Sequence, residues 1–407
     1  MHLRYLFVFT ALLSAGTLPA LDVVPQAPSA VLLDQATGRV LFEKNPDKPI
    51  PPASLTKLMT LHLAWKALAD GTVHASDLVP VTAATTGPSV PPESSLMFLA
   101  PGQQVTFREL MLGLAVDSGN DAGMTIAQFL AGSQEAFVAR MNAESQALGL
   151  THTVFFDAFG YDARNLTTAA DYARFSRFYL IAHPQSLELL HSVRTLAYPQ
   201  PENRAPGDTR PVRTILQTNR NGLLGAYPGA DGLKTGYIDE SGYNFAATAL
   251  RNGQRLVAVL LGVQARSTAE GSRSRNAAAA KLLDWGFENY PLRPLPLPEL
   301  RPLRVWYAEP ERVALAPAAA TVYPLADGEL AGIDEHVDAP REIRGPAAAG
   351  SVVGRLVWTK NGRELYSVPL RTSAAAAAAP WWTDVWDAVV LFFRGFTGRP
   401  APAALHT

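Results

Sequence analysis

Residues 51–60 read Pro-Pro-Ala-Ser-Leu-Thr-Lys-Leu-Met-Thr, and the rest of the chain is organised around them. The two prolines exclude helix before Ser54, whereas the residues from Leu55 to Gly71 are good helix formers. Ser54 is therefore expected in the first turn of a helix, with Lys57 one turn later on the same face. The helix interior is almost entirely apolar, so the helix should be buried and its lysine should need a partner. Lys57 beside the Ser54 hydroxyl is a candidate base beside a candidate nucleophile, although a capping serine and a solvated lysine explain this pair alone equally well.

The composition predicts a globular protein of two domains. At 407 residues the chain exceeds the size at which a single core stops growing, and 48% hydrophobic against 17% charged residues suits a core-forming protein. The net charge of -1 gives no electrostatic basis for binding nucleic acid, so we expect no such partner. The lack of cysteine excludes thiol catalysis, cysteine-ligated zinc and disulfides.

The first 20 residues have the layout of a secretory signal peptide. His2 and Arg4 precede an apolar run from Tyr5 to Leu13, and small residues follow up to Ala20, where cleavage is expected. An N-terminal membrane anchor is the alternative, but the run is short for a span. The sequence therefore predicts a protein that acts outside the cytoplasmic membrane.

Residues 21–290 are expected to form one α+β domain in which helices cover an antiparallel sheet. A β-hairpin over residues 29–43 comes first, and three strands joined by tight turns form a meander between Ala230 and Leu261. Strands at both ends with helices between them predict one sheet covered by helices. The expected helices after the first are Thr106–Leu114, one that starts at Asp121, Gln134–Leu148, Ala169–Ala182 and Asn276–Tyr290. Pro199–Arg213 is expected to be an exposed loop.

The remaining third of the chain has four expected parts. A stiff proline-rich linker at residues 291–302 leads to a small all-β domain at residues 303–372. An alanine-rich spacer follows at residues 373–380. In residues 381–397, aromatic residues recur at helical spacing opposite polar ones, which predicts an amphipathic helix at a membrane surface. A helix packed on the β domain is the alternative.

Three short motifs occur in order along the chain: Ser54-x-x-Lys57, Ser118-x-Asn120 and Lys234-Thr235-Gly236. Each alone arises by chance in a chain of ordinary composition. Together, at a helix start, a turn between helices and a strand of the sheet, they form a strong signal. This set is the S-x-x-K, S-D-N and K-T-G series of class A β-lactamases and penicillin-binding proteins, with glycine in place of the middle aspartate.

The chain resembles the low-molecular-mass penicillin-binding proteins, which are serine-type D-alanyl-D-alanine carboxypeptidases. The resemblance implies a β-lactamase or transpeptidase-like catalytic domain. Two departures bear on substrate preference: Ile238 stands where a hydroxyl residue is common, and the loop at Pro199–Arg213 is enlarged. The matching segments are Pro52–Lys57, Ser94–Leu99, Ser118–Ala122, Asn219–Leu224, Asp231–Gly236 and Gly242–Asn244.

The residues themselves suggest how the hydroxyl is activated. A free lysine titrates near ~10.4, but burial and a second cation lower that pKa, and Lys234 would be such a cation. Lys57 would then be the base that activates Ser54. Ser118 would bridge the two lysines and pass the proton to the leaving amine, because a hydroxyl both donates and accepts.

The same motifs offer groups that could bind a peptide. Asn120 offers an amide to the substrate backbone, and Lys234 with Thr235 suits a terminal carboxylate. Gly236 lets the substrate lie close along its strand. The resemblance also implies an oxyanion hole formed by the backbone N–H groups of Ser54 and Tyr237, and it places Arg220 near the carboxylate site.

The function implied by the resemblance is removal of the terminal D-alanine from peptidoglycan pentapeptide through an acyl-serine intermediate. Its partners would be the peptidoglycan stem peptide, β-lactam antibiotics and the cytoplasmic membrane, with the protein peripheral on the periplasmic face. No cofactor and no metal are expected, since the histidines lack metalloprotease spacing, and His62 is interpreted as a core residue. A D,D-endopeptidase, a β-lactamase and an inactive peptidoglycan-binding scaffold are the alternatives.

Overall fold

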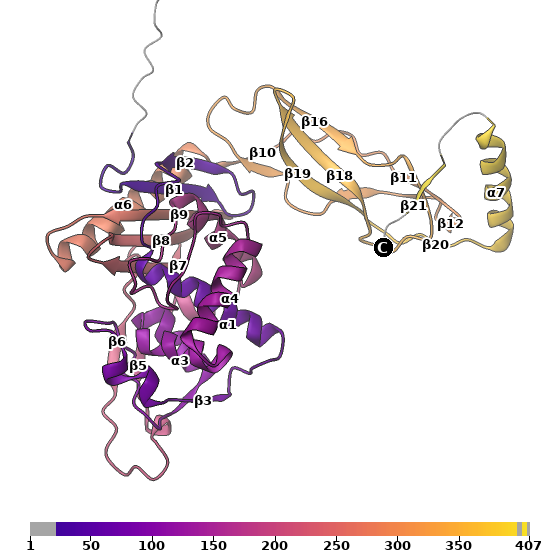
Figure 1. The fold of residues 1–407 in the computed structure, drawn as a ribbon. Coiled ribbons are helices and arrows are strands. Elements are labelled where there is room, and N and C mark those ends of the chain that lie inside the picture. The colour runs from indigo at the N-terminus through magenta and orange to yellow at the C-terminus, as the bar shows by residue number, and fades with distance from the viewer. Residues whose placement is uncertain (1–21, 397–400, 405–407) are drawn as a thin grey trace, which may run out of the picture.

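Five antiparallel strands form the central sheet of the first domain, in the order β2-β1-β9-β8-β7 (Figure 1). The computed structural model describes residues 22–396 and 401–404, so the predicted signal peptide lies outside the described residues. Both the hairpin and the meander are confirmed, and β1 joins them by pairing with β9. The strands are β1 (Ser29–Asp34), β2 (Val40–Lys44), β7 (Ala230–Ile238), β8 (Gly242–Arg251) and β9 (Gln254–Val263).

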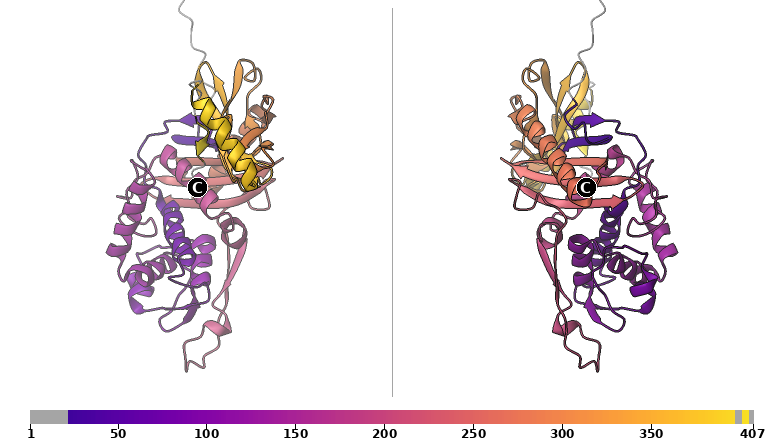
Figure 2. Two further views of the ribbon diagram at one scale, coloured as in Figure 1. Left: turned by 90° about the vertical axis from the view of Figure 1, so that its right-hand side faces the viewer. Right: turned by 90° about the vertical axis from the view of Figure 1, so that its left-hand side faces the viewer.

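Helices cover both faces of this sheet, which confirms the α+β class. Helix α6 packs on β8 and β9 from one side and α5 packs on β9 and β1 from the other. In the right-hand view of Figure 2, α6 crosses the strands and the remaining helices of the domain gather beneath them. The helices are α1 (Lys57–Ala69), α2 (Phe107–Leu112), α3 (Asn120–Ala131), α4 (Gln134–Ala147), α5 (Ala169–Ala182) and α6 (Thr268–Asn289). Two short strand pairs complete the domain: β3 (Leu78–Pro80) with β4 (Gln104–Thr106), and β5 (Thr195–Tyr198) with β6 (Ile215–Thr218).

The helix expected from Leu55 begins two residues later than predicted. Residues Ala53–Thr56 form a 3-10 turn, in which the N–H of Leu55 donates to the carbonyl of Pro52 at 3.2 Å. Helix α1 then starts at Lys57. Residues three apart eclipse each other in a 3-10 turn, so Lys57 still lies on the same side as Ser54.

Helices α2 and α6 differ most from their predicted bounds. Thr106 forms a capping box with Glu109, but α2 ends at Leu112 and passes into a π-helical turn, Gly113–Asp117. Ser118 follows with a left-handed φ of 61° and separates this turn from α3. Helix α6 begins two turns before Asn276, because Ser267 caps it by accepting from the N–H of Glu270.

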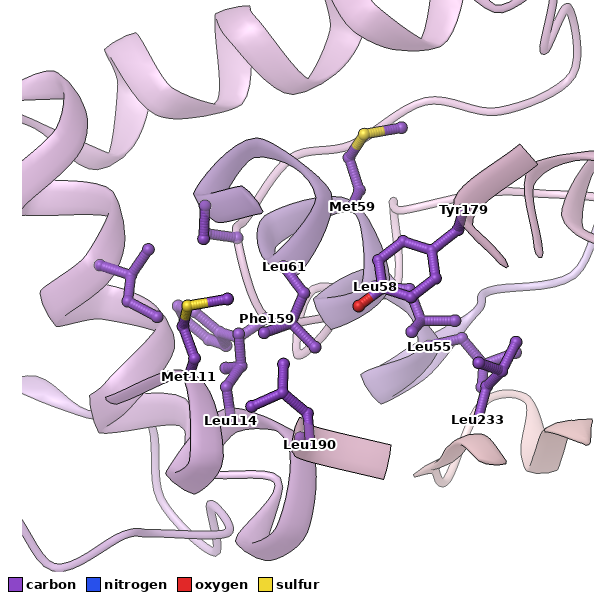
Figure 3. Close-up of a cluster of buried hydrophobic side chains, with 14 of the residues drawn as sticks. Leu55, Leu58, Met59, Leu61, Met111, Leu114, Phe159, Tyr179, Leu190 and Leu233 are labelled. Atoms are coloured by element: carbon purple, nitrogen blue, oxygen red, sulfur yellow. The ribbon is translucent and has the colours of Figure 1, made fainter. Parts of the chain in front are cut away.

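Helix α1 is buried, as its apolar composition predicted. Leu55, Leu58 and Leu61 are fully buried and contribute to a cluster with Leu114 and Leu233 (Figure 3). This packing fixes the 3-10 turn that carries Ser54 against both the helical layer and strand β7.

His62 is a core residue, as interpreted from the sequence. Its Nδ1 lies 2.8 Å from Nε2 of His183, and its Nε2 lies 2.9 Å from a carboxylate oxygen of Glu144. Burial lowers the pKa of His62, and burial followed by the charges of His62 and Lys66 lowers the pKa of His183 to about 4. The folded protein therefore holds this pair neutral.

We expect this histidine pair to make the protein less stable in acid. The unfolded chain takes up protons near pH ~6.5, whereas folded His183 does so only near pH 4. The free energy of unfolding should therefore decrease as the pH is lowered from the first value to the second. Urea unfolding at a series of pH values measures how steeply the free energy of unfolding changes with pH. The substitution His183→Gln should reduce this slope, and His74→Gln, at an exposed histidine, should not. An unchanged slope in His183→Gln would assign the acid sensitivity to other groups.

The second domain is all-β, as predicted, and its two main sheets have the orders β14-β19-β18-β16 and β13-β11-β17-β21. Part of the expected linker is a strand, since β10 pairs with β15, and part of the expected spacer is another, since β20 pairs with β12. Arg39 of the first domain forms an ion pair of 2.8 Å with Glu329 of the second. The strands are β10 (Leu292–Pro294), β11 (Leu303–Trp306), β12 (Ala308–Glu309), β13 (Arg312–Val313), β14 (Leu315–Pro317), β15 (Val322–Pro324), β16 (Ile333–Asp338), β17 (Glu342–Arg344), β18 (Val352–Lys360), β19 (Arg363–Thr372), β20 (Ala377–Ala378) and β21 (Ala403–Ala404).

Helix α7 (Trp381–Gly395) lies at the end of this second domain that is remote from the first (Figure 1). It attaches through its polar side: buried Asp387 accepts from the N–H of Tyr307 at 2.8 Å, and Arg394 donates to Glu342 at 2.7 Å. Its aromatic side is exposed, with Trp386 at 67% and Phe393 at 64%. Within residues 22–396 and 401–404, no helix combines the length and apolarity needed to cross a membrane.

Candidate active site

One cleft at the edge of the sheet brings together seven of the nine predicted site residues. They come from the 3-10 turn, the segment after the π-helical turn, the loop after β6, and strand β7. The other two, Lys57 and Lys234, are buried at 0% and 2% exposure beneath it. The seven that line the cleft are Ser54, Ser118, Asn120, Arg220, Thr235, Gly236 and Tyr237.

The ammonium group of Lys57 is held directly beside the Ser54 hydroxyl. Its Nζ lies 2.9 Å from Oγ of Ser54, 2.7 Å from Oδ1 of Asn120 and 2.5 Å from the backbone carbonyl of Phe159. Burial lowers the pKa of Lys57 to about 7, against the opposing charge of Asp157. A lysine with this pKa is neutral in a large fraction of molecules at neutral pH, as a base must be.

Two cations lie near Lys57. Arg220, which was not predicted in this role, adds to burial in lowering the pKa of Lys57. The predicted second cation, Lys234, repels Lys57 in turn: burial first and the charge of Lys57 second lower the pKa of Lys234 well below its ordinary value, and this repulsion acts on both lysines. Both lysines are thus perturbed by one shared cationic cluster.

Ser118 contacts one lysine rather than bridging two. Lys234 Nζ donates to Oγ of Ser118 at 3.0 Å and to the carbonyl of Thr235 at 3.1 Å. The hydrogen bonds of the described residues include none between Ser118 and Lys57. The π-helical turn and the left-handed Ser118 together place this hydroxyl over strand β7.

The amide of Asn120 was predicted to meet the substrate, but in the unliganded structure it is already engaged on both sides. Its Oδ1 accepts from Lys57, and its Nδ2 donates to Oγ of Ser94 at 2.8 Å. Asn120 therefore orients Lys57 before any substrate arrives.

Gly236 allows strand β7 to lie against the nucleophile turn. A Cβ atom at this position would meet the carbonyl oxygen of Pro52 at 2.7 Å and the backbone nitrogen of Ser54 at 3.0 Å. Those two contacts are with backbone, which cannot move aside as a flexible side chain would. Gly236, the residue before Tyr237, therefore lets the backbone of β7 lie in close contact with the backbone at Ser54.

Sequence reasoning missed several residues of this site. The carbonyl of Phe159 is positioned because Asp157 accepts from the N–H groups of Phe159 at 2.9 Å and of Gly160. Arg275 lines the cleft and donates to the carbonyl of Arg220 at 3.0 Å. These are single residues outside any motif, and only the fold brings them to the cleft.

Comparison with known proteins gives consistent matches over both domains. The family model for D-alanyl-D-alanine carboxypeptidase matches residues 19–265, and that for the C-terminal domain of penicillin-binding protein 5 matches residues 299–377. The chain is 32% identical to D-alanyl-D-alanine carboxypeptidase DacC of Escherichia coli, over 97% of this chain and 94% of that protein.

Solved structures agree with this match. Penicillin-binding protein 5 from Haemophilus influenzae is similar with a TM-score of 0.68 and 29% identity, over 86% of this chain and 98% of that one. Penicillin-binding protein D2 from Listeria monocytogenes, in its ampicillin-bound form, gives a TM-score of 0.54 and 28% identity, over 64% of this chain and 98% of that one.

Proposed function

Since the chain belongs to the D-alanyl-D-alanine carboxypeptidase family and is an enzyme of that serine type, we propose that Ser54 is its nucleophile and Lys57 its general base. The observation that carries this proposal is the hydrogen bond of 2.9 Å between the two side chains, with the lysine buried and its pKa near 7. The substrate is the peptidoglycan stem peptide, from which the enzyme removes the terminal D-alanine. A cell-wall substrate means that the enzyme works after export.

Acylation then follows from the geometry. Neutral Lys57 takes the proton of the Ser54 hydroxyl while Oγ attacks the carbonyl carbon of the penultimate D-alanine. The N–H groups of Ser54 and Tyr237 stabilise the oxyanion as it forms. The carbon–nitrogen bond breaks, and the proton that Lys57 took from Ser54 passes to the departing D-alanine amine, which leaves Lys57 neutral for the second half-reaction. Ser118 is a hydroxyl of the cleft that can relay it, by donating its own proton to the amine and accepting one in return, and Lys234 holds Ser118 in place beforehand.

The carboxylate of the terminal D-alanine needs a cationic site next to this centre. Arg220 lines the cleft, Lys234 lies just beneath it, and Thr235 offers a hydroxyl between them. Gly236 leaves the edge of β7 free of side chain, so the peptide can lie along it as an added strand. Water hydrolyses the acyl-enzyme in the second half-reaction, with Lys57 again as base.

Mass spectrometry after treatment with benzylpenicillin tests the nucleophile. We expect one covalent adduct, located on the peptide that contains Ser54, and none in Ser54→Ala. Ser94→Ala is the matched control, because this serine lines the same cleft without contacting Lys57, and it should retain the adduct. An adduct that disappears within seconds would indicate a β-lactamase, and the lack of any adduct would indicate an inactive scaffold.

We also propose that α7 attaches the protein peripherally to a membrane. All five aromatic side chains of α7, and Phe396 directly after it, are exposed, because the helix docks on the domain through Asp387 and Arg394 instead. An aromatic face left in water is unfavourable, and such rings are stable at the level of lipid headgroups. The alternative, a helix packed on the β domain, is met by the polar side of α7, and these contacts leave its aromatic side exposed.

Removing aromatic area from α7 should weaken membrane binding. The double substitution Trp386→Ser with Phe393→Ser removes two exposed rings and should reduce co-sedimentation with lipid vesicles at least about tenfold. Leu216→Ser, at a residue of β6 that is 68% exposed, is the control and should bind as the unmodified protein does. Equal sedimentation of the double variant would rule out α7 as the anchor.

A further inference from the structure

Asp117 is a buried acid for which the mechanism has no use. It is the last residue of the π-helical turn, immediately before Ser118, and its exposure is 1%. Both of its carboxylate oxygens lack a hydrogen-bond partner among the described residues. An unpartnered buried carboxylate is costly, so its environment must either neutralise it by protonation or offset its charge.

The charges around Asp117 are those of the proposed carboxylate site. Arg220 and Lys234 lower its pKa, but burial and the neighbouring charge of Asp121 outweigh them and raise the pKa to about 7. Asp117 is also the anion that acts on Arg220, whose own pKa is lowered by burial. The proposed carboxylate site therefore has its own titratable counter-ion, whose pKa lies near neutral pH.

The other groups packed around this turn are engaged elsewhere. Asp121 accepts from the N–H groups of Met97 at 2.8 Å and Leu99 at 3.0 Å. The π-helical turn Leu187–His191 presents His191, whose Nδ1 lies 3.1 Å from the carbonyl of Leu233. Strand β5 presents Tyr198, which donates to Gln103, and β6 has no titratable residue. Asp117 is thus a carboxylate of this region that no hydrogen bond among the described residues holds in one protonation state.

We propose that Asp117 is a specificity residue for the terminal carboxylate of the substrate, and that it takes up a proton from solvent when that carboxylate docks beside Arg220 and Lys234. This inference rests on the proposed function. Two carboxylates that share one cationic site cannot both stay ionised without mutual repulsion, so the buried one is protonated. The proton comes from bulk water and returns when the product leaves, and the uptake is largest where Asp117 is ionised before binding.

The departure at Ile238 fits this arrangement. This residue lines the cleft where a hydroxyl residue is common among the proteins that the chain resembles, and its side chain cannot donate a hydrogen bond. Recognition of the carboxylate therefore depends more on charge. If charge governs the site, a change in the protonation state of Asp117 changes the affinity of the site for the carboxylate.

Infrared difference spectroscopy tests the proton uptake directly. The protein is Ser54→Ala, which binds without turnover, and the probe is an N-acylated tripeptide ending in D-Ala-D-Ala. We expect binding to produce the carbonyl band of a protonated carboxyl group, and this band should be missing with Asp117→Asn added. Glu240→Gln, which removes an exposed carboxylate at the rim of the cleft, should keep the band. The C-terminal amide of the same peptide should produce no band.

The pH dependence of binding gives a second measurement. If the bound carboxylate raises the Asp117 pKa by about one unit, the Asp117→Asn protein should bind the peptide about tenfold more tightly than the Asp117 protein near pH ~9 and about equally near pH ~6. A band that persists without Asp117, or no band in the Ser54→Ala protein itself, would overturn the proposal whether or not Asp117→Asn folds. Failure of the proposed function would be seen separately, as the lack of an adduct on Ser54.

Discussion

Replacing Lys57 by methionine should lower the rate constant for acylation of Ser54 by roughly a thousandfold or more. Methionine keeps most of the buried volume, so the fold should survive, but it cannot accept the proton of the Ser54 hydroxyl. The hydroxyl then has no base within hydrogen-bond reach, since the other two partners of the lysine, Asn120 and the carbonyl of Phe159, would remain as polar groups of low basicity. Time courses of labelling with a fluorescent penicillin measure the rate.

The pH profile of the unmodified enzyme should report the same lysine. Its pKa of about 7 implies that acylation rises with pH up to that value, as Lys57 loses its proton, and then levels. Lys281→Met removes an exposed lysine of α6 by the same chemical change, so it should leave both rate and profile unchanged. Acylation that persists in Lys57→Met at the normal rate would assign the base to another group.

The pairing of Ser54 with Lys57 could be predicted because both lie within one local turn. A short motif followed by apolar residues specifies a helix start and a lysine that points back to it, whatever the rest of the chain does. The prediction survived the change from an α-helical to a 3-10 turn, since either turn brings residues three apart together. Strand β7, which carries Lys234, could be predicted for the same reason, because the tight turns that follow it along the meander are marked by the local sequence.

Relations between distant segments could not be predicted in the same way. The sequence suggested that Ser118 bridges two lysines, yet among the described residues its hydroxyl is hydrogen-bonded to Lys234 and not to Lys57. The partners of Lys57 are Ser54, Asn120 and the carbonyl of Phe159. Asp117 went unnoticed because an isolated aspartate has no pattern; its significance comes only from burial beside Arg220 and Lys234. Tertiary packing, not local propensity, decides which polar groups meet in a cleft.

Some predicted element boundaries were wrong for a related reason. The first two turns of α6 contain mainly serine, arginine and small residues, so no apolar periodicity marks them, and the capping residue Ser267 was the available signal. In the second domain, the proline-rich segment was read as a linker although β10 within it pairs with β15. An edge strand can contain proline, so composition alone does not exclude a strand there.

Gly236→Ala should reduce acylation about a hundredfold to a thousandfold, the effect of losing one donor of an oxyanion hole. The added methyl group would approach the carbonyl oxygen of Pro52 to 2.7 Å and the nitrogen of Ser54 to 3.0 Å, so β7 must shift away from the turn. That shift would move the N–H of Tyr237 away from the N–H of Ser54, the pair that we propose as the oxyanion hole. The rate of labelling by penicillin measures the loss, and thermal unfolding measures any change in stability.

Gly395→Ala separates this steric effect from the general consequence of replacing glycine by alanine. A Cβ atom at Gly395, in α7, would meet nothing within 4 Å, so that variant should acylate at the normal rate. Lys57 remains beside Ser54 in Gly236→Ala, because its three hydrogen bonds come from other segments, and the pH at which acylation levels should therefore be unchanged. A slow rate with an unshifted pH profile would mean that the base is intact and the oxyanion hole is lost, whereas a normal rate would show that the N–H of Tyr237 is not one of its donors.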